Sequence, residues 1–406
     1  MCSRLFGLLG FVVLLFYISN EASGMEERFT DSSDEYPESL QPSNEFLDSF
    51  EPSSEPPDLL PLFSNQVPRS FQAQPSMSKY SAFVVFGDSY SDNGHARAPQ
   101  HNDSFAAKPA VGGRFCDGPV WNEYLVQKLA NSEQSNITFL NYAYNGAHIN
   151  NTLSNSFPNP VPDTGEQIQT YLTELENYVK HPTSAKGLAG NILHTIWIGI
   201  NPILSIWRST SYGNETLHPG TFLTPELVEK VDKQVAELNK QLLLLLNNAS
   251  VSEFQSDFLI MTIPPLTFTN LAVTQAAQQA KGDVTLARKY ITLLGELTDD
   301  YNQKLVSSIQ SIRRQQSMYR GVQNFLHRKK RGCRVTLFDT VKFWNDVKSE
   351  PQKFGIQSLG SCYTNTQKPP CKQPDHFMYW DILHPSSILH DDLSTAVKTV
   401  IDGLDQ

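Results

Sequence analysis

Five short, nearly continuous apolar segments limit what this chain can fold into. They are "SAFVVFGDS" (81–89), "ITFLNYA" (137–143), "ILHTIWIGIN" (192–201), "DFLIMTIPP" (257–265) and "RVTLFDT" (334–340). Segments of this length, rich in β-branched and aromatic residues, are typical of strands buried on both faces of a parallel sheet. Helical patterns separate them along the chain. The alternation predicts an α/β protein with three α/β/α layers and a mainly parallel five-stranded sheet.

The clearest helical pattern lies over residues 224–248, between the third and fourth apolar segments. Thr224 is the expected N-cap and Pro225 stands in the first turn. Apolar residues follow at three- and four-residue spacing: Val228, Val231, Val235, Leu238, Leu242 and Leu245. Further helical patterns cover residues 271–318 and 386–404, the second with Ser386 or Ser387 as its expected cap.

Residues 1–24 have the composition of a secretory signal peptide, with a basic start, an apolar core and small residues near Gly24. The alternative is an uncleaved membrane anchor, but the apolar run is shorter than the roughly 20 residues that a spanning helix needs. No other segment of the sequence is a candidate for spanning a membrane. We therefore expect a secreted protein without a stable membrane anchor.

Acidic residues dominate the segment that follows. Residues 25–60 carry eleven Asp or Glu against the single Arg28, which accounts for the whole formal net charge of −10. Together with many Ser and Pro residues, this composition predicts a disordered linker over residues 25–78, as a propeptide, a spacer or a solvated tail. A single folded domain is expected over residues 79–406. The acidic linker therefore says nothing about the substrate of that domain. We expect a monomer that acts on a small-molecule or carbohydrate ester, with no nucleic acid as partner.

Four cysteines remain after Cys2 is removed with the signal peptide: Cys116, Cys333, Cys362 and Cys371. An even number in a secreted chain favours disulfides. Cys362 and Cys371 bracket a short Pro-containing loop and are the expected pair, whereas Cys116 and Cys333 pair or stay free. Their spacings fit no zinc pattern, so neither a metal ion nor another cofactor is expected. Five acceptor sequences predict a glycoprotein: Asn102, Asn136, Asn150, Asn214 and Asn248.

Polar or glycine residues stand where three of the predicted strands end. Ser89 follows the first strand, Gly146 the second and Asn201 the third, and Asp381 and His384 lie in a segment after the fifth. In open parallel sheets, ligands gather at the carboxyl ends of the strands. Taken singly, each residue has an ordinary structural explanation, since Ser and Asn cap helices, Gly makes turns, and Asp and His are often surface residues.

Together these residues supply the parts that acyl transfer requires. A Ser89 nucleophile needs a histidine to take its proton, and His384 needs a carboxylate such as Asp381 to fix its tautomer. The backbone N–H groups of Ser89 and Gly146 and the side-chain amide of Asn201 would form the oxyanion hole. The G-x-S-x-G sequence of another large esterase fold is absent. The residues therefore predict acyl transfer through a Ser–His–Asp triad.

Four short segments in this order resemble the motif blocks of the GDSL-type, or SGNH, lipases and acylhydrolases. They are "FGDSYSDNG", "NYAYNGA", "WIGIN" and "YWDILHP". The segments "GRFCDGPVWNEYL" (113–125) and "IPPL" (263–266) are similar to those of the secreted fungal and plant members. The resemblance covers about residues 80–405 and implies a flavodoxin-like sheet, the SGNH hydrolase fold. It also implies the nucleophile at Ser89, the oxyanion hole with Gly146 and Asn201, and His384 with Asp381.

The sequence departs from the usual family pattern at four positions. Pro202 replaces an Asp, and we expect it to push Asn201 towards an extended backbone. Tyr90 replaces the commoner Leu, Asn145 a frequent Gly, and Cys116 a frequent Ser. None of these changes removes a catalytic group.

The substrate is less constrained than the chemistry. Residues 154–162 and 202–222 are expected to shape the acyl pocket, and neither has the long amphipathic stretch expected of a lipid-interface lid. We therefore expect hydrolysis of short acyl esters, acetyl in particular, of carbohydrates or similar soluble substrates. The alternatives are a lipase or phospholipase for longer acyl chains, or an inactive secreted binding protein with the same fold.

Other conspicuous residues have structural interpretations. We expect His390 on the surface of the last helix, and Trp197 and Trp380 in the core. The basic stretch at 327–334 is expected to be a solvated helix end or loop, with proteolytic processing or an anionic partner as the alternative.

Overall fold

The computed structural model describes residues 79–94, 114–130, 137–153, 161–181, 190–210, 222–325, 333–363 and 371–403. For residues 318–325 it describes the backbone alone. The predicted signal peptide and linker, and the acceptor sites at Asn102, Asn136 and Asn214, lie outside these ranges. So do nearly all of the basic stretch 327–334 and most of the two segments expected to shape the acyl pocket.

The five predicted strands form one sheet in which every neighbouring pair is parallel. They are β1 (Tyr80–Gly87), β2 (Thr138–Asn141), β3 (Asn191–Trp197), β4 (Gln255–Met261) and β5 (Arg334–Phe338). Their order across the sheet is β2-β1-β3-β4-β5. Because parallel neighbours end at the same edge, the residues after β1, β2 and β3 all lie along one edge of the sheet.

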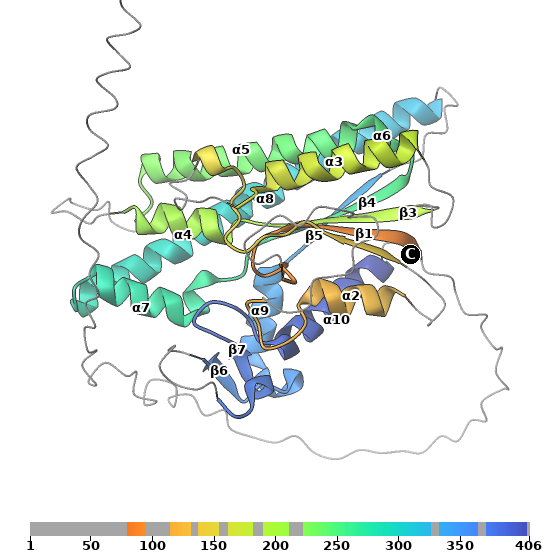
Figure 1. Ribbon diagram of the computed structural model, residues 1–406. Coiled ribbons are helices and arrows are strands. Elements are labelled where there is room, and N and C mark those ends of the chain that lie inside the picture. The colour runs from red at the N-terminus through yellow and green to blue at the C-terminus, as the bar shows by residue number, and fades with distance from the viewer. Residues whose placement is uncertain are drawn as a thin grey trace, which may run out of the picture. The chain divides into compact units, whose positions relative to one another are not determined.

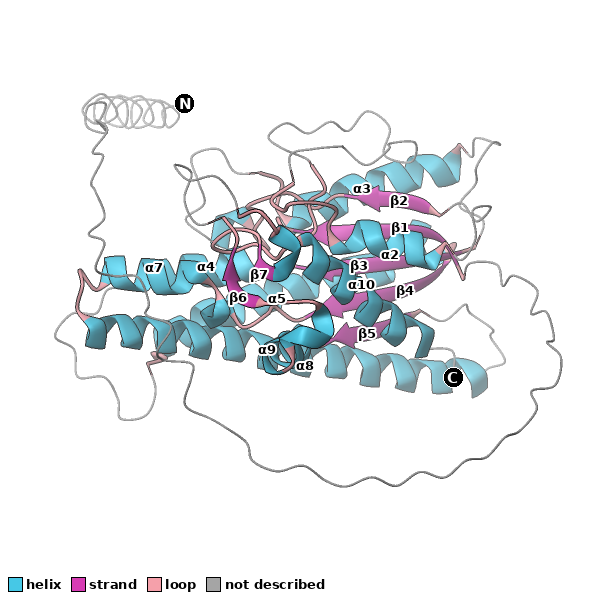
Figure 2. Cartoon of the chain, turned by 90° about the horizontal axis from the view of Figure 1, so that it is seen from below, coloured by secondary structure: helices cyan, strands magenta, loops and turns pink. Residues whose placement is uncertain are grey.

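Helices cover both faces of this sheet, which gives the predicted three layers (Figures 1 and 2). One face carries α3 (Thr164–Lys180), α5 (Pro225–Asn247) and α8 (Val284–Phe325). The other carries α2 (Trp121–Leu129), α9 (Thr340–Ser349) and α10 (Ser387–Asp402). The remaining helices are α4 (Ile200–Arg208), α6 (Ala249–Ser252) and α7 (Asn270–Gln279), with short 3₁₀ turns at Asn151–Leu153, Leu266–Phe268, Pro351–Phe354 and Pro374–His376.

The sequence signals at the start of α5 have the expected structural effect. Thr224 is the N-cap, and its side chain accepts a hydrogen bond from the backbone N–H of Leu227, while Pro225 is the first helical residue. Val231, Leu238 and other predicted positions of the apolar face are buried. The helical pattern over 271–318 corresponds to α7 and α8, separated by a short turn.

The central strands of the sheet are buried on both sides, as the continuous apolar segments predict. In β1, residues Ala82 to Phe86 are fully buried, and in β3 residues Ile192 to Trp197 are at most 1% exposed. Trp197 therefore belongs to the core, as expected. A strand held from both faces gives the residue that follows it a fixed position.

A second, two-stranded sheet lies near the C-terminal end of the chain and was not predicted. It pairs β6 (Ser358–Ser361) with β7 (Phe377–Tyr379). The predicted disulfide between Cys362 and Cys371 is present and closes the loop between these strands, with a Cα–Cα distance of 5.0 Å. Cys116 and Cys333, whose pairing the sequence left open, do not form a disulfide with each other.

Within the described ranges, no helix is long and apolar enough to cross a membrane.

Candidate active site

The end of β1 is held by two hydrogen bonds from a helix. Gly87 donates its N–H to Gln167 Oε1 at 2.9 Å, and its carbonyl accepts from Gln167 Nε2 at 3.0 Å. A Cβ at this position would lie 2.4 Å from the carbonyl oxygen of Trp197 in β3, so only glycine fits here. The strand therefore ends at a fixed point.

A tight turn then presents Ser89 at the edge of the sheet. The carbonyl of Asp88 accepts hydrogen bonds from the N–H groups of Ser91 and Asp92, both at 2.9 Å. The turn reverses the chain directly after Asp88. Ser89 is 5% exposed, so its hydroxyl lies in a largely enclosed environment.

The structure brings Ser89, His384 and Asp381 together in one chain of hydrogen bonds. His384 Nε2 lies 2.9 Å from Ser89 Oγ. On the other side of the ring, His384 Nδ1 lies 2.8 and 3.0 Å from the two carboxylate oxygens of Asp381. These three side chains are in the arrangement that a histidine-activated serine requires.

The charge of Asp381 determines which ring nitrogen carries the proton. Burial acts to raise the pKa of Asp381, but the hydrogen bonds and the charge of His384 hold that pKa below its ordinary value. The carboxylate also accepts the backbone N–H groups of Leu383 and His384, at 2.8 and 2.6 Å. An ionised carboxylate only accepts hydrogen bonds, so Nδ1 of His384 must donate and Nε2 is free to accept from Ser89.

Tyr90, where the family more often has Leu, anchors the segment that carries the histidine. Its hydroxyl donates to the carbonyl of Leu383 at 2.6 Å, and its ring centroid lies 5.8 Å from that of His384. The Trp380 N–H donates to the carbonyl of His384 at 2.8 Å. The carbonyl groups of Leu383 and of His384 itself are thus fixed, the first of them to the turn that carries Ser89.

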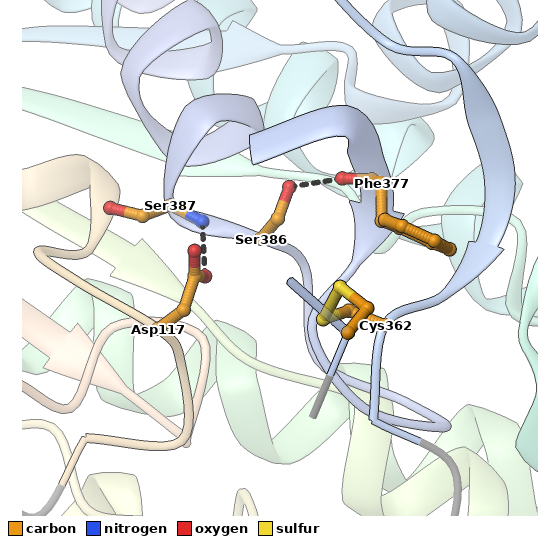
Figure 3. The surroundings of a disulfide bond; sticks show 6 residues. Asp117, Cys362, Phe377, Ser386 and Ser387 are labelled. Carbon is orange, nitrogen blue, oxygen red and sulfur yellow. Dashed lines mark hydrogen bonds between the residues drawn. A yellow bond between two sulfur atoms is a disulfide. The ribbon is translucent and has the colours of Figure 1, made fainter. Parts of the chain in front are cut away.

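The start of α10 corrects one prediction. Ser386 is the N-cap by position, but its hydroxyl donates to the carbonyl of Phe377 at 2.5 Å and does not cap the helix (Figure 3). The cap comes from a distant segment, because Asp117 Oδ1 accepts the N–H of Ser387 at 2.8 Å. Asp117 lies 270 residues away in the sequence, and no local pattern identifies it.

The loop after β2 is tied to the turn that carries Ser89. Asp92, which is fully buried, accepts the N–H of Asn145 at 2.7 Å through one carboxylate oxygen and that of Gly94 at 2.9 Å through the other. Gly146 follows with a φ of +78°, in the left-handed region that favours glycine. The position of Gly146 is therefore set from the Ser89 turn.

Asn201 joins the same group of loops from β3. Its side-chain Nδ2 donates to the carbonyl of Ala147, the residue after Gly146, at 3.0 Å. An amide nitrogen carries two hydrogens, so a second donor remains. Ser89, Gly146 and Asn201 are thus linked at one edge of the sheet through Asp92, Asn145 and Ala147.

The expected effect of Pro202 on Asn201 is wrong. Asn201 is helical, because α4 begins at Ile200 and Pro202 is its third residue. The first N–H groups of a helix have no intrahelical partner, so a proline in the first turn loses no hydrogen bond there.

The expected surface position of His390 is also wrong. It is 1% exposed, and its ring lies edge-on to Tyr90 at 6.4 Å. Burial, with a smaller contribution from the charge of His384, lowers the pKa of His390 to about 3, so this histidine is neutral at physiological pH. Trp380, expected in the core, is only partly buried and stacks on Tyr363 at 5.7 Å.

The residue before Ser89 carries a second buried carboxyl group that sequence reasoning did not identify. Asp88 is 1% exposed; its Oδ1 accepts the N–H of Tyr90 at 3.1 Å, and its Oδ2 has no partner among the described residues. Burial raises the pKa of Asp88 to about 7 and the charge of Asp92 adds to the effect, against the Tyr90 hydrogen bond and the charge of His384.

Among the described residues, no group of three His, Cys, Asp or Glu side chains could hold a metal ion.

Comparisons with known proteins identify one family that matches most of the chain. The sequence model of the family described as "GDSL-like Lipase/Acylhydrolase" matches residues 83–391, which is most of the chain. A thermolabile hemolysin of Vibrio parahaemolyticus is 24% identical over 328 residues, covering 76% of this chain. An acetylesterase of Thermothelomyces thermophilus is 21% identical over 303 residues, covering 74% of this chain and 83% of that enzyme.

The extent of these matches differs. The alignment spans only 60% of the length of the hemolysin. A crystal structure described as a GDSL-like lipase from Parabacteroides merdae covers 80% of this chain and 99% of its own, with 12% identity and a TM-score of 0.35.

The pKa of Asp88 leads to a prediction about stability. A carboxyl group whose pKa is raised on folding binds more protons in the native than in the unfolded state between about pH 4 and pH 7, so the free energy of unfolding falls over that range. Asp88→Asn removes this loss. We expect the difference in unfolding free energy between Asp88→Asn and the wild type to grow by roughly 2–4 kcal/mol from pH 4 to pH 7 and then level off.

Urea unfolding at four pH values from 4 to 8 measures this difference. Asp375→Asn, at an exposed carboxylate, is the control and should leave the difference near zero throughout. A difference for Asp88→Asn that does not change with pH would show that folding does not raise the pKa of Asp88.

Proposed function

Because the chain belongs to the GDSL-like lipase/acylhydrolase family, we propose that it is a secreted serine ester hydrolase that removes short acyl groups from soluble esters. Carboxylic ester hydrolysis is the activity that the family and its named esterases support. The nucleophile, the class of ester and the secretion of the chain are our proposals.

One observation carries the proposed chemistry: the unbroken hydrogen-bond chain from Ser89 Oγ through His384 to the Asp381 carboxylate. Ser89 Oγ attacks the carbonyl carbon of the ester while its proton passes to His384 Nε2. Asp381 stabilises the imidazolium that forms. When the tetrahedral intermediate collapses, His384 returns the proton to the leaving alcohol and an acyl group remains on Ser89. Water then attacks the acyl group by the same route, which regenerates Ser89 and releases the acid.

The negative charge of the tetrahedral intermediate needs donors that are already in place. The backbone N–H groups of Ser89 and Gly146 and the side-chain amide of Asn201 are the proposed donors. The hydrogen bonds of Asp92 to Asn145 and of Asn201 to Ala147 support this assignment, because they hold these donors to the Ser89 turn. Donors fixed before the reaction cost no reorganisation during it.

Two observations support short acyl groups, acetyl in particular, on carbohydrates or similar soluble molecules. Ser89 is largely enclosed, and a relative aligned over most of its length is named an acetylesterase. The second candidate is a lipase or phospholipase for longer acyl chains, which the relative named as a hemolysin keeps open. An inactive binding protein is disfavoured by the hydrogen-bonded triad.

The proposal of secretion rests on the composition of residues 1–24. The disulfide between Cys362 and Cys371 supports it, because such bonds persist in oxidising compartments.

Replacing the proposed nucleophile tests the mechanism. We expect Ser89→Ala to lower kcat for an aryl acetate by about 10⁶-fold, because only the residual effect of the oxyanion donors and of binding remains. Hydrolysis followed by release of the phenol measures this. Ser252→Ala, at an exposed serine on α6, is the control and should retain full activity. Equal activity of Ser89→Ala and the wild type would refute the assignment of the nucleophile.

A series of aryl esters from acetate to palmitate tests the substrate class. We expect kcat/KM to be highest for the acetate or butyrate and to fall for longer acyl chains, with Ser89→Ala as the background rate at each length. A maximum for octanoate or longer esters would instead support the lipase alternative.

A further inference from the structure

We infer that Phe115 forms a wall of the subsite for the alcohol portion of the ester and favours alcohols that present a flat apolar face. An aryl ring and the CH-rich face of a sugar ring both have this property. The inference rests on the proposed function, because it assigns a substrate contact in the same site.

Phe115 packs against the proposed general base. Its ring centroid lies 5.4 Å from that of His384, with the ring planes inclined at 37°. The ring of Tyr90 also lies beside His384, but Tyr90 is fully buried and its hydroxyl is bonded to Leu383. Phe115 is partly exposed, so its ring can contact both the histidine and a bound molecule.

The chemistry of the histidine determines which part of the ester lies beside it. His384 Nε2 must return its proton to the oxygen of the departing alcohol, so that oxygen must come within hydrogen-bonding distance of Nε2. The carbonyl oxygen of the ester points instead to the proposed oxyanion donors at Gly146 and Asn201. A side chain that packs on the His384 ring is therefore on the alcohol side of the ester bond.

The segment that carries Phe115 is fixed at both of its ends. Before it, Arg114 forms two charged hydrogen bonds with Glu123 of α2, one of them at 2.8 Å from Nε. After it, Asp117 caps the first turn of α10 through Ser387, as Figure 3 shows. Since α10 begins directly after the segment that carries His384, the same contacts set the position of Phe115 relative to the histidine.

This wall is rigid and has no hydrogen-bonding group. Burying an apolar face of the alcohol against it gains hydrophobic and ring-stacking free energy, whereas a flexible polar alcohol gains little. Phe115 is thus a specificity-determining residue for the alcohol and not for the acyl group.

A pair of acetates whose alcohols have similar acidity tests the inference. Benzyl acetate presents a flat ring, and 2-methoxyethyl acetate does not. We expect Phe115→Ala to lower kcat/KM for benzyl acetate by about tenfold and for 2-methoxyethyl acetate by less than about twofold. An acetylated methyl glycoside forms the third arm and reports whether a sugar face uses the same wall.

The acetyl-enzyme supplies an internal control. Every acetate forms the same acetyl-enzyme, from which the alcohol has already left, so Phe115→Ala should leave the rate of deacylation unchanged. A burst experiment with an aryl acetate measures this rate separately. Phe115→Tyr keeps the ring and should keep the preference for benzyl acetate. If Phe115→Ala does not fold, Phe115→Leu takes its place in the test. Phe354→Ala, which removes a partly buried ring packed on Phe343, should not change the ratio of the two rates.

Equal losses for the two acetates, or a slower deacylation in Phe115→Ala, would overturn the inference and indicate that Phe115 only supports the fold of the site. A wild-type protein that hydrolyses none of the acetates would overturn the proposed function itself.

Discussion

The hydrogen bond between Ser89 Oγ and His384 Nε2 joins two residues that are 295 positions apart, and the arrangement of the site depends on it. It forms because both of its ends are held. On the serine side, β1 is buried on both faces and ends at Gly87, which Gln167 fixes through two hydrogen bonds. On the histidine side, Tyr90 holds the carbonyl of Leu383 and Asp117 caps the helix that follows. A shift of either end by one ångström would lengthen this hydrogen bond, and misplacements of that size cost about 10²-fold in the rate of an enzyme.

Much of the fold could be predicted from the sequence. A continuous apolar segment identifies a strand buried on both faces from its own residues, whichever helices and strands pack against it. The same holds for the start of α5, where Thr224 and Pro225 act on their own helix. Ser89, His384 and Asp381 stand in short motifs and are brought within hydrogen-bonding distance. Two of the errors concern residues whose environment depends on distant parts of the chain. His390 is buried against Tyr90, some 300 positions earlier, and the cap of α10 is Asp117. No pattern in the neighbouring residues predicts either contact.

The polar groups around Ser89 have different consequences for the protein. Asp381 is stabilised as a carboxylate by His384, whereas Asp88 favours its protonated form because it is buried with one oxygen unpartnered. Asp92 accepts two backbone N–H groups and connects the nucleophile turn to the proposed oxyanion loop. Three carboxyl groups near one serine thus differ in their surroundings: Asp381 bonds to His384, Asp88 is buried with one oxygen unpartnered, and Asp92 bonds to the loop after β2. Phe115 adds an apolar boundary on the side where the alcohol must leave.

The central claim is that hydrolysis proceeds through an acyl group on Ser89. The most direct measurement is mass spectrometry of the protein after rapid mixing with an aryl acetate and acid quenching within the first turnover. The account predicts one acetyl group, located on the peptide that contains Ser89, which appears in the burst phase and disappears when the substrate is exhausted. An acetyl group on another residue, or phenol release with no acetylated protein at any time, would contradict it.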